Sequence, residues 1–425
     1  MRISRAARAA AVASTVLVLM LVEPATGGAR SGAAAFDELH GDLGGAWPTD
    51  FHAWSTHRDF TRGTVEGLQV LRGRDAAVTL APGTTTGSWT SGWYTPPDAF
   101  TQLVPSWHSN TPAGTWVEIG LQVRTATTES MWFNLGRWAS DTSAIERSSM
   151  DGQGDPVGRV FTDTFVARAA PPGGTPVGYR LRATLHGTGT AAPVVRQLAA
   201  TSAAPGPLPE VSQPLSRRPV ELGVPPYSQS IHSGEYPQFG GGGGVWCSPT
   251  STAMVLSYWR TGPTAEDLAA LPPDPVFDRN GRADGQVAWA AINTWDYVYE
   301  GAGNWPFNTA YASEYGLDGS VRQFSTLRAV ESWVRRGVPV VTSINWNNND
   351  TDPLNDLDGS SITSTDGHLM LVIGFTADGD VIANDPASPS NADVRHIYRR
   401  DQFERNWLRA SDGTTYIIKP HRITG

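Results

Sequence analysis

The sequence predicts a multidomain protein, with an N-terminal all-β sandwich of jelly-roll-like type followed by a C-terminal α+β domain. Three observations support this prediction. At 425 residues, the chain is long enough to bury two hydrophobic cores. Apolar and polar residues alternate up to about residue 200, whereas helical and strand patterns are combined after about residue 220. The 16 tryptophans divide evenly, eight before residue 201 and eight after it, so both halves can bury large side chains.

Residues 1–35 have the pattern of a secretory signal peptide. Three arginines within the first eight residues precede an apolar run from Ala9 to Val22, and small residues follow it. The run is shorter than the roughly 20 residues that span a bilayer, although an uncleaved membrane anchor is the alternative. We therefore expect a secreted, extracellular protein that is cleaved after Gly27 or after Ala35.

The charge balance argues against two classes of partner. Removal of residues 1–35 takes away four arginines and one glutamate, which leaves 28 basic and 40 acidic residues, a net charge of about −12. An acidic chain without a basic cluster is repelled by phosphate backbones and by anionic lipid. We therefore expect no nucleic-acid partner, and no membrane partner once the signal peptide is cleaved.

Residues 36–200 are predicted to form the β-sandwich. The segments 115–124 (TWVEIGLQVR) and 179–186 (YRLRATLH) place apolar side chains at every second position, and turn residues separate such stretches. No amphipathic helix is evident, and most of the tryptophans are expected in the core. Stacking on sugars, such as those of a cell-wall glycan, is the alternative for Trp89, Trp93, Trp107 and Trp138.

Residues 201–220 are rich in Pro, Ser and Ala, which predicts a semi-stiff linker. We therefore expect residues 221–425 to form a separate domain, and a fragment over 215–425 to fold without the first domain and keep the active site. The helices and strands expected in it are helices over 248–260 and 326–337 and strands over 339–346, 368–375 and 380–386.

The only cysteine of the chain, Cys247, lies just before the first of these helices, after a run of five glycines (240–244) expected to form a flexible approach. One cysteine cannot form an internal disulfide, and an exported free thiol is open to oxidation. Free backbone N–H groups and the helix dipole favour the thiolate at a helix start, and the thiolate is a nucleophile. We predict a nucleophilic cysteine, with an inert buried cysteine as the alternative.

His368 opens a predicted strand, 121 positions after Cys247, so the fold would have to join the two. An imidazole beside the thiol can take its proton and later protonate a leaving amine. A strand-end histidine bonded to solvent is the alternative. An acidic or amide group must orient the imidazole, and Asp385 follows the next predicted strand. The outer ends of a hairpin need not meet, so Asn384 and an ordinary Asp-Pro turn are alternatives.

A side-chain amide, together with the backbone N–H of the nucleophile, can bind the oxyanion of a tetrahedral intermediate. Gln229 and Gln238 both precede the cysteine. We favour Gln229, because the apolar VPPY segment before it can anchor it, whereas Gln238 lies against glycines, which hold a side chain poorly. Both could instead be surface amides.

Four motifs in this order, VPPYSQ, WCSPTSTAMVLSYW, DGHLMLVIGF and NDPAS, resemble the C39-like group of papain-fold cysteine peptidases over about residues 221–420. That group is similar to the bacteriocin-leader peptidase domains of export transporters. The resemblance implies a papain-like α+β fold. It also implies these roles: nucleophile Cys247, base His368, orienting acid Asp385 and oxyanion amide Gln229.

The sequence departs from the family pattern in two places. Cys-Ser-Pro replaces the common Cys-Gly-Pro, and the interval of 18 positions from Gln229 to Cys247 is long. The chain lacks a GxxxxGK[ST] phosphate loop and a membrane domain, so leader processing coupled to export is not expected. The N-terminal half resembles the β-rich domain that accompanies such peptidases in some secreted bacterial proteins.

The predicted function is a secreted cysteine peptidase that cleaves peptide or protein substrates through a thioester intermediate, without metal or cofactor. A cell-wall peptidoglycan amidase or endopeptidase with the same Cys–His chemistry is one alternative. A catalytically silent protein that binds glycan or protein is another. The acidic loop over 347–359 could hold Ca²⁺ through oxygen ligands, but it lacks EF-hand spacing, and a solvated loop is favoured.

Overall fold

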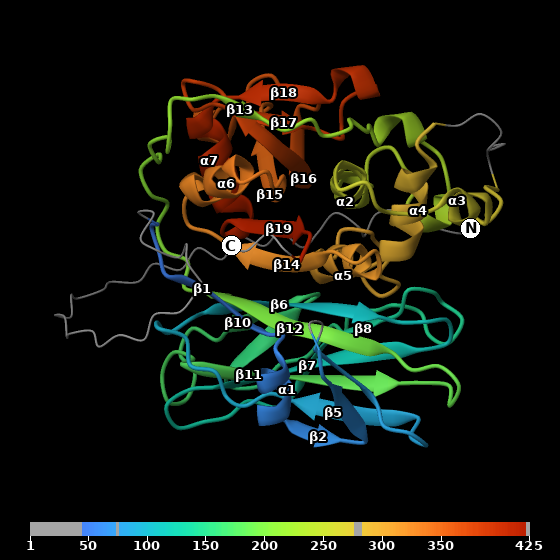
Figure 1. The fold of residues 1–425 in the computed structure, drawn as a ribbon. Helices are drawn as coiled ribbons and strands as arrows, with labels where there is room; N and C mark the ends of the chain where they lie inside the picture. Colours follow the sequence, from blue (N-terminus) through green and yellow to red (C-terminus); the bar gives the residue numbers. More distant parts are fainter. Residues whose placement is uncertain (1–44, 74–75, 276–282, 422–425) are drawn as a thin grey trace, which may run out of the picture.

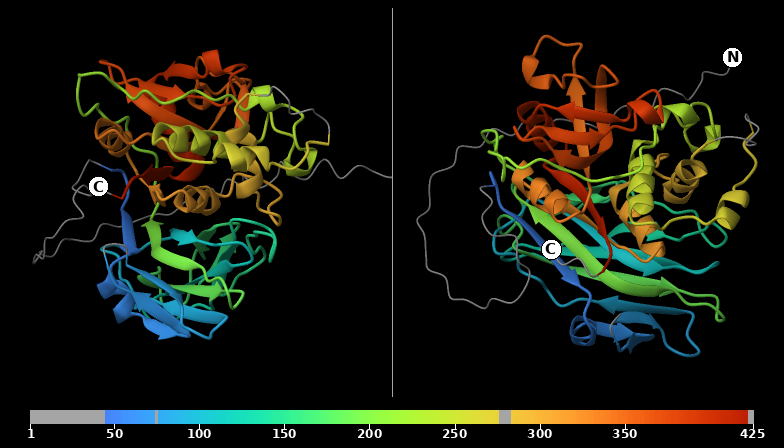
Figure 2. Two further views of the ribbon diagram at one scale, coloured as in Figure 1. Left: turned by 45° about the vertical axis from the view of Figure 1, so that its right-hand side comes forward. Right: turned by 45° about the horizontal axis from the view of Figure 1, so that its top comes forward.

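The computed structural model describes residues 45–73, 76–275 and 283–421, and the predicted signal peptide lies outside these ranges. Within them, no helix is long and apolar enough to cross a bilayer. An N-terminal all-β region packs against a C-terminal domain of helices and sheet, one above the other (Figure 1), and the further views in Figure 2 show the same layering.

Two antiparallel sheets form the N-terminal region. The strands of the first sheet are β1 (Thr49–Trp54), β3 (Leu68–Leu71), β4 (Ala77–Leu80), β6 (Gln102–Asn110), β9 (Gly158–Phe161), β10 (Thr164–Ala167) and β12 (Val194–Ala203), in the order β3-β4-β12-β6-β10-β9 with β1 on β12. The strands of the second are β2 (Thr64–Glu66), β5 (Thr86–Thr90), β7 (Trp116–Arg124), β8 (Phe133–Trp138) and β11 (Gly178–His186), in the order β2-β5-β11-β7-β8. One short helix, α1 (His57–Arg62), was not expected; a capping box between Thr56 and Asp59 starts it.

The predicted alternation sets the register of the second sheet. Leu181 of β11 lies opposite Leu121 of β7, and Ala183 lies opposite Ile119. All four side chains are fully buried, because apolar residues on paired strands face the same side. A slip of one residue would turn this apolar set to solvent.

The first sheet is covered on both faces. Its central strand β6 is buried from Leu103 to Ser109, which is unusual for a sandwich strand. Figure 1 shows the reason, since β6 and β12 lie against the C-terminal domain. Ser109 N–H, for example, donates to the hydroxyl of Ser313 in that domain at 3.3 Å.

The tryptophans proposed for sugar stacking are mostly internal. Trp89, Trp107 and Trp138 are fully buried, so their faces are occupied by the core. Trp93 is half-buried on the outer face of the second sheet, where the guanidinium groups of Arg124 and Arg180 lie 4.8 and 4.7 Å from its ring centroid.

The C-terminal domain holds a third sheet and most of the helices. Its strands are β13 (Val220–Glu221), β14 (Asp318–Gln323), β15 (Val340–Asn347), β16 (Ser364–Phe375), β17 (Val381–Asn384), β18 (Arg395–Tyr398) and β19 (Thr414–Lys419), in the order β14-β19-β15-β16-β17-β18 with β13 on β16. Its helices are α2 (Cys247–Tyr258), α3 (Ala265–Ala269), α4 (Gly285–Thr294), α5 (Trp305–Glu314), α6 (Leu327–Arg335) and α7 (Arg400–Ser411), with short 3₁₀ turns η1 (Ser230–His232), η2 (Pro237–Phe239), η3 (Pro353–Asn355) and η4 (Asn391–Asp393). The predicted helices appear as α2 and α6, and the predicted strands as β15, β16 and β17.

The segment between the domains, residues 204–219, contains no helix or strand, and it lies along the C-terminal domain. Arg400 of α7 donates to the carbonyl oxygen of Ser212 at 2.6 Å. The backbone N–H of Leu215 donates to the buried carboxylate of Glu331 in α6 at 3.0 Å. The predicted linker is therefore fastened to the surface of the second domain.

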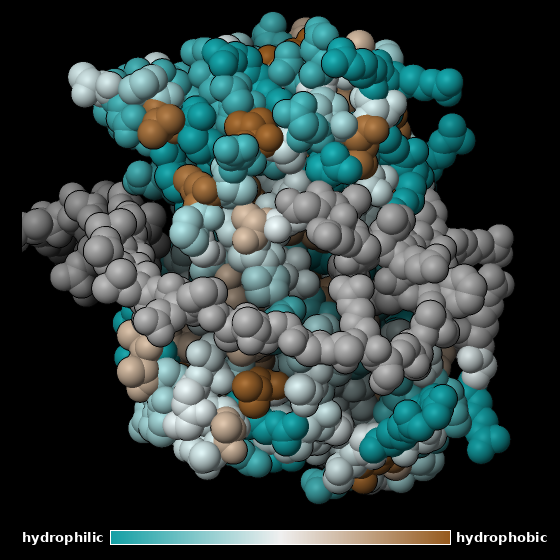
Figure 3. All heavy atoms as spheres, turned by 90° about the vertical axis from the view of Figure 1, so that its left-hand side faces the viewer, coloured by the Kyte–Doolittle hydropathy of each residue, from teal (hydrophilic) through white to brown (hydrophobic). Residues whose placement is uncertain are grey.

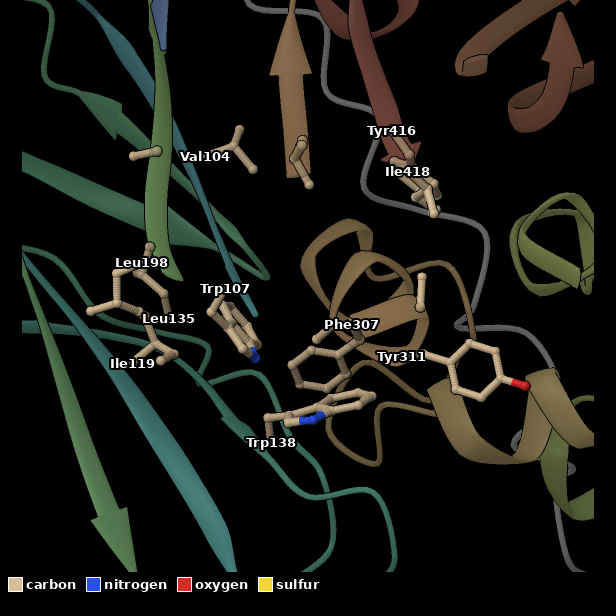
Figure 4. Packing of buried hydrophobic residues seen from close by; sticks show 14 of the residues in the cluster. Val104, Trp107, Ile119, Leu135, Trp138, Leu198, Phe307, Tyr311, Tyr416 and Ile418 are labelled. Carbon is tan, nitrogen blue, oxygen red and sulfur yellow. The ribbon is translucent and has the colours of Figure 1, made fainter. Parts of the chain in front are cut away.

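The two domains share a hydrophobic core. Phe307 of α5 lies with its ring 6.1 Å from Trp107 and 5.4 Å from Trp138, both from the N-terminal region (Figure 4). The buried residues of the sandwich and those around α2, α4 and α5 form one continuous cluster. This finding argues against the expectation that residues 221–425 fold without the first domain, because that fragment would expose α5.

Polar groups also cross the interface. The carboxylate of Glu314, at the end of α5, accepts hydrogen bonds from the hydroxyl of Thr111 at 2.8 Å and the indole N–H of Trp138 at 3.2 Å. Burial raises the pKa of Glu314, against the opposing effect of these hydrogen bonds. On the part of the face that is coloured in Figure 3, hydrophobic residues appear as separate spots among hydrophilic ones.

Candidate active site

Cys247 is the first residue of α2 and is partly exposed. The preceding Trp246 offers no side-chain cap to the first turn of α2, in which Pro249 has no N–H to donate. Burial by itself raises the pKa of the Cys247 thiol. The hydrogen bond and charge of His368, with the backbone N–H groups of Leu369 and Ser248, more than offset burial, and the net pKa is lowered. The thiolate is therefore favoured at this position.

His368 on β16 and Asp385, the residue after β17, lie next to each other in the third sheet. Strands β16 and β17 form an antiparallel hairpin in which Leu371 lies opposite Asn384, so the end of β17 lies beside the middle of β16, three positions after His368. His368 Nε2 lies 2.7 Å from Oδ1 of Asp385. The concern that the outer ends of a hairpin need not meet does not apply here, because a short turn joins the strands and pairing continues to Asn384.

The imidazole bridges the thiol and the carboxylate. Since Nε2 is bonded to Asp385, Nδ1 is the ring nitrogen left for the hydrogen bond with Cys247. Burial alone lowers the pKa of His368, but the charge and hydrogen bond of Asp385, followed by those of Cys247, raise it to about 10. The indole of Trp346 packs edge-on against the imidazole, with centroids 5.4 Å apart. The lowered pKa of the thiol and the raised pKa of His368 favour a thiolate–imidazolium pair.

Asp385 is fully buried and has several hydrogen-bond donors. Oδ1 accepts the backbone N–H of Ala387 at 2.9 Å, and Oδ2 accepts the hydroxyl of Tyr398 at 2.8 Å. Burial raises the pKa of Asp385, but the imidazolium and these donors lower it overall. The neighbouring Asn384 points away, with its amide donating to the sulfur of Met254, so Asp385 is the residue that faces the imidazole.

Gln229 lies beside the acid. Its backbone N–H donates to the carbonyl oxygen of Pro386 at 2.8 Å. Flanking serines fasten the same segment, since the Ser230 hydroxyl donates to the carbonyl of Ala387 at 3.0 Å and Ser228 N–H donates to Asn391 at 2.7 Å. The side chain is buried, and its carboxamide oxygen has no hydrogen-bond partner among the residues that the structure describes. Packing and neighbouring bonds thus hold the residue, and its amide is not committed to a structural role.

Gln238 and the glycine run differ from this pattern. Gln238 is exposed on a 3₁₀ turn. The four residues Gly240 to Gly243 all have positive φ, and Gly234 N–H donates to the carbonyl of Gly241 at 2.7 Å. A Cβ on Gly242 would lie 2.0 Å from the carbonyl oxygen of His232. The run is therefore a close-packed left-handed turn that requires glycine, and not an irregular approach to the cysteine.

The structure accounts for one departure from the family pattern. Ser248, in the Cys-Ser-Pro sequence, is fully buried, and its hydroxyl lies 2.9 Å from the hydroxyl of Tyr416 on β19. The serine ties the first turn of α2 to the sheet. Sequence reasoning missed this contact and also Tyr398 and Trp346, because nothing in their local sequence marks them; only the strand pairing places them.

The acidic loop over 347–359 is hydrogen-bonded to itself and to its surroundings. Asp350 accepts from the amide of Asn355 at 2.7 Å, and Asp352 caps η3 by accepting from Leu354 N–H at 3.0 Å. Within the described ranges, no group of three or more His, Cys, Asp or Glu residues is arranged to hold a metal ion.

Comparison with known proteins defines the class. Residues 221–415 match the model of the Peptidase C39-like family, and residues 50–203 match the Peptidase C39 N-terminal domain. The C-terminal domain therefore matches a peptidase family, and the N-terminal domain matches the domain described as the N-terminal domain of Peptidase C39 proteins. The chain belongs to the C39-like peptidase family.

Solved structures give weaker likenesses. A Bacillus anthracis structure, described as a C39-like peptidase, has 17% identity and a TM-score of 0.30, covering 48% of this chain and 98% of its own. A family two carbohydrate esterase from Cellvibrio japonicus has 13% identity and a TM-score of 0.19, with 39% of this chain and 38% of that chain covered. No curated protein matches the chain.

Proposed function

We propose that this chain is a secreted cysteine peptidase in which Cys247 attacks a peptide carbonyl, His368 transfers the proton and Asp385 orients the imidazole. One observation carries the proposal: a thiol at a helix start interacts electrostatically with an imidazole whose Nε2 lies 2.7 Å from a buried carboxylate. Membership of a peptidase family supports the reaction class. The roles of the three residues, the papain-like arrangement and export directed by residues 1–35 are parts of this proposal.

The reaction proceeds in two halves. The thiolate of Cys247 bonds to the carbonyl carbon and forms a tetrahedral oxyanion. The imidazolium of His368 then protonates the leaving amine as the C–N bond breaks, which leaves a thioester. In the second half, the neutral imidazole takes a proton from water, and the hydroxide oxygen attacks the thioester carbon. Collapse releases a carboxylic acid and returns the thiolate and the imidazolium.

Two donors are available for the oxyanion. The backbone N–H of Cys247 lies in the uncapped first turn of α2, and such groups are free to bind an anion. The carboxamide of Gln229 would supply the second donor, since its backbone is fastened beside Pro386 and its side chain is buried. Donors held in place before the reaction stabilise a developing charge most effectively.

Peptides or proteins outside the cell are the proposed substrates. The test uses the full chain without residues 1–35 and a peptide library read by mass spectrometry. Cys247→Ala should abolish cleavage and keep the unfolding midpoint, because only the nucleophile is lost; loss of one catalytic group can cost several orders of magnitude in rate. Chelators should leave the rate unchanged.

A matched acid control accompanies this test. Asp393 is exposed and bonds only to Ser390 among the described residues, so Asp393→Asn should behave as wild type, whereas Asp385→Asn should lose most activity. Full activity in Cys247→Ala would refute the proposal. Cleavage confined to purified cell wall would instead identify a peptidoglycan amidase or endopeptidase.

A further inference from the structure

A loop from the C-terminal domain is built around a buried carboxylate and held by the N-terminal domain. Oδ1 of Asp296 accepts the backbone N–H groups of Ser149, Val298 and Tyr299 at 3.0 to 3.1 Å. Oδ2 accepts the amide of Asn304 at 2.9 Å. Ser149 belongs to the N-terminal domain, so the loop over 296–304 takes its shape from both domains.

Arg147 makes a second attachment. Its side chain is fully buried, and it donates to the carbonyl oxygens of Ile292 at 2.7 Å and Trp295 at 3.4 Å, at the end of α4 where backbone carbonyls have no helical partner. Its own carbonyl accepts Tyr297 N–H at 3.0 Å. The start of the loop is thereby fixed to the sandwich.

The tip of this loop is apolar and exposed. Tyr299 is 51% exposed and Val298 is 47% exposed, although both backbones are bonded to buried Asp296. The Tyr299 ring lies against glycines of its own loop: a Cβ on Gly301 would approach Cε1 to 2.6 Å, and one on Gly303 would approach it to 3.7 Å. A rigid base therefore presents a large aromatic ring to solvent.

The start of this loop lies beside the segment that leads to the nucleophile, because Trp295 and Val245 both flank Gly240. Burial raises the pKa of the Tyr299 phenol, and the charges of Asp163, Cys247 and Asp296 raise it further. The hydroxyl of Tyr416 lies 2.9 Å from that of Ser248 in the first turn of α2; burial raises the pKa of Tyr416, and the charges of Asp163, Cys247 and Tyr299 raise it further.

Further apolar side chains continue this surface toward the cysteine. Val245, two positions before Cys247, is 50% exposed. A Cβ on Gly240 would meet both Val245 at 2.8 Å and the ring of Trp295 at 3.4 Å, so these two side chains flank the glycine turn. Phe239 packs against Trp295 with centroids 5.7 Å apart. Apolar surface next to a nucleophile, on a rigid base, is what binding of an apolar side chain requires.

We propose that Tyr299 forms the wall of a substrate subsite beside Cys247 and binds a large apolar side chain of the peptide, next to the scissile bond. This inference rests on the proposed peptidase function and adds the class of substrate. Because Asp296 and Arg147 fix the loop, the N-terminal domain serves as a support for substrate recognition.

The experiment measures kcat/KM for peptides that carry Phe or Gly in turn at each position flanking the scissile bond. Wild type should prefer Phe at one position. Tyr299→Ala should lower kcat/KM for that Phe peptide by about 10-fold to 200-fold and leave the Gly peptide unchanged, the range for contacts in an apolar pocket. Tyr299→Phe should restore the preference, because the ring and not the hydroxyl forms the wall.

The two loop glycines supply a matched pair of variants. The three atoms nearest to a Cβ on Gly301 all belong to the Tyr299 ring, so Gly301→Ala must displace the ring and should also reduce the preference for Phe. Gly303→Ala makes an ordinary contact and should keep it. Leu354→Ala, at a 54% exposed residue on η3, controls for loss of exposed apolar surface.

Alkylation of Cys247 by iodoacetamide separates the two hypotheses. Equal alkylation rates in all variants, with selectivity lost in Tyr299→Ala and Gly301→Ala, support the subsite. A preference for Phe that persists in Tyr299→Ala overturns it and leaves the peptidase intact. Absence of peptide cleavage by wild type overturns both.

Discussion

The phenolic oxygen of Tyr398 lies 2.8 Å from Oδ2 of Asp385 and donates a hydrogen bond to the carboxylate. This bond holds the acid while its other oxygen faces His368. Tyr398 is thus a positioning residue of the proposed site, contributed by a strand whose sequence gives no hint of it.

Tyr398→Phe should destabilise the protein at pH 7 and lower kcat by about ten-fold, since a hydrogen bond to a charged group contributes roughly 1.5–3 kcal/mol. The folded pKa of Asp385 is lowered, so its stabilising effect exists above the unfolded pKa and is lost as pH falls through the folded value. Urea unfolding at pH 7 and pH 3 should therefore show a larger deficit at pH 7.

Tyr258→Phe is the control for that substitution. The Tyr258 hydroxyl donates to the neutral carbonyl of Gly337 at 3.0 Å, so its loss should cost the same free energy at both pH values. An equal deficit for Tyr398→Phe at pH 7 and pH 3 would show that its hydroxyl does not stabilise the Asp385 charge.

The thiolate of Cys247 should persist below the pH at which an ordinary thiol becomes protonated, near 8.5. The pKa of the thiol is lowered and that of His368 is raised to about 10, so the ion pair exists between the two. Iodoacetamide should alkylate wild type at nearly constant rate from about pH 8.5 down to the lowered pKa. In His368→Asn the rate should fall about ten-fold per pH unit below about 8.5. Identical profiles would show that the imidazole does not stabilise the thiolate.

Gln229→Ala should lower kcat by about 10²–10³ with KM nearly unchanged, because an oxyanion donor acts mainly in the transition state. Gln238→Ala should stay near wild type, since its side chain is exposed. Steady-state kinetics on one peptide substrate tests both. The opposite result would assign the donor to Gln238, and two small effects would leave backbone N–H groups alone in that role.

Removal of the N-terminal domain should prevent folding of the remainder. A fragment over 204–425 would expose Phe307 and the face of α5 that packs on Trp107 and Trp138. We expect it to be insoluble or inactive, and Phe307→Ala in the full chain should cost about 3–5 kcal/mol. Calorimetry should show one unfolding transition for the whole chain. Trp93→Ala, at a half-buried position on the outer sheet face, is the control. A soluble fragment that cleaves peptides would contradict the shared core.

Local sequence patterns predict the strands that have one face buried and the other partly exposed. β7 and β11 have one buried face, so alternation identifies them. The helix that begins at Cys247 and the strand that holds His368 were also predicted. The pairing of His368 with Asp385 could only be suggested, because it depends on the length of a hairpin turn.

Contacts between domains leave no periodic pattern of apolar residues in the sequence. β6 is buried on both faces, so its polar residues, such as Ser106 and Ser109, do not mark a solvent side. Arg147 would be taken for a surface residue from its sequence, yet it is buried at the end of α4. The expectation of an independent second domain could not take this shared core into account, since a proline-rich composition indicates a connection between domains and carries no information about the surfaces that pack together.

The fastened segment between the domains has a consequence for proteolysis. Leu208 and Val211 are exposed, at 45% and 38%, while the chain just beyond them is tied to Arg400 and Glu331. A protease that nicks the backbone near Leu208 would cut the covalent connection and leave Phe307 between Trp107 and Trp138. The nicked protein should therefore elute as one particle on a sizing column and separate into two pieces only in detergent.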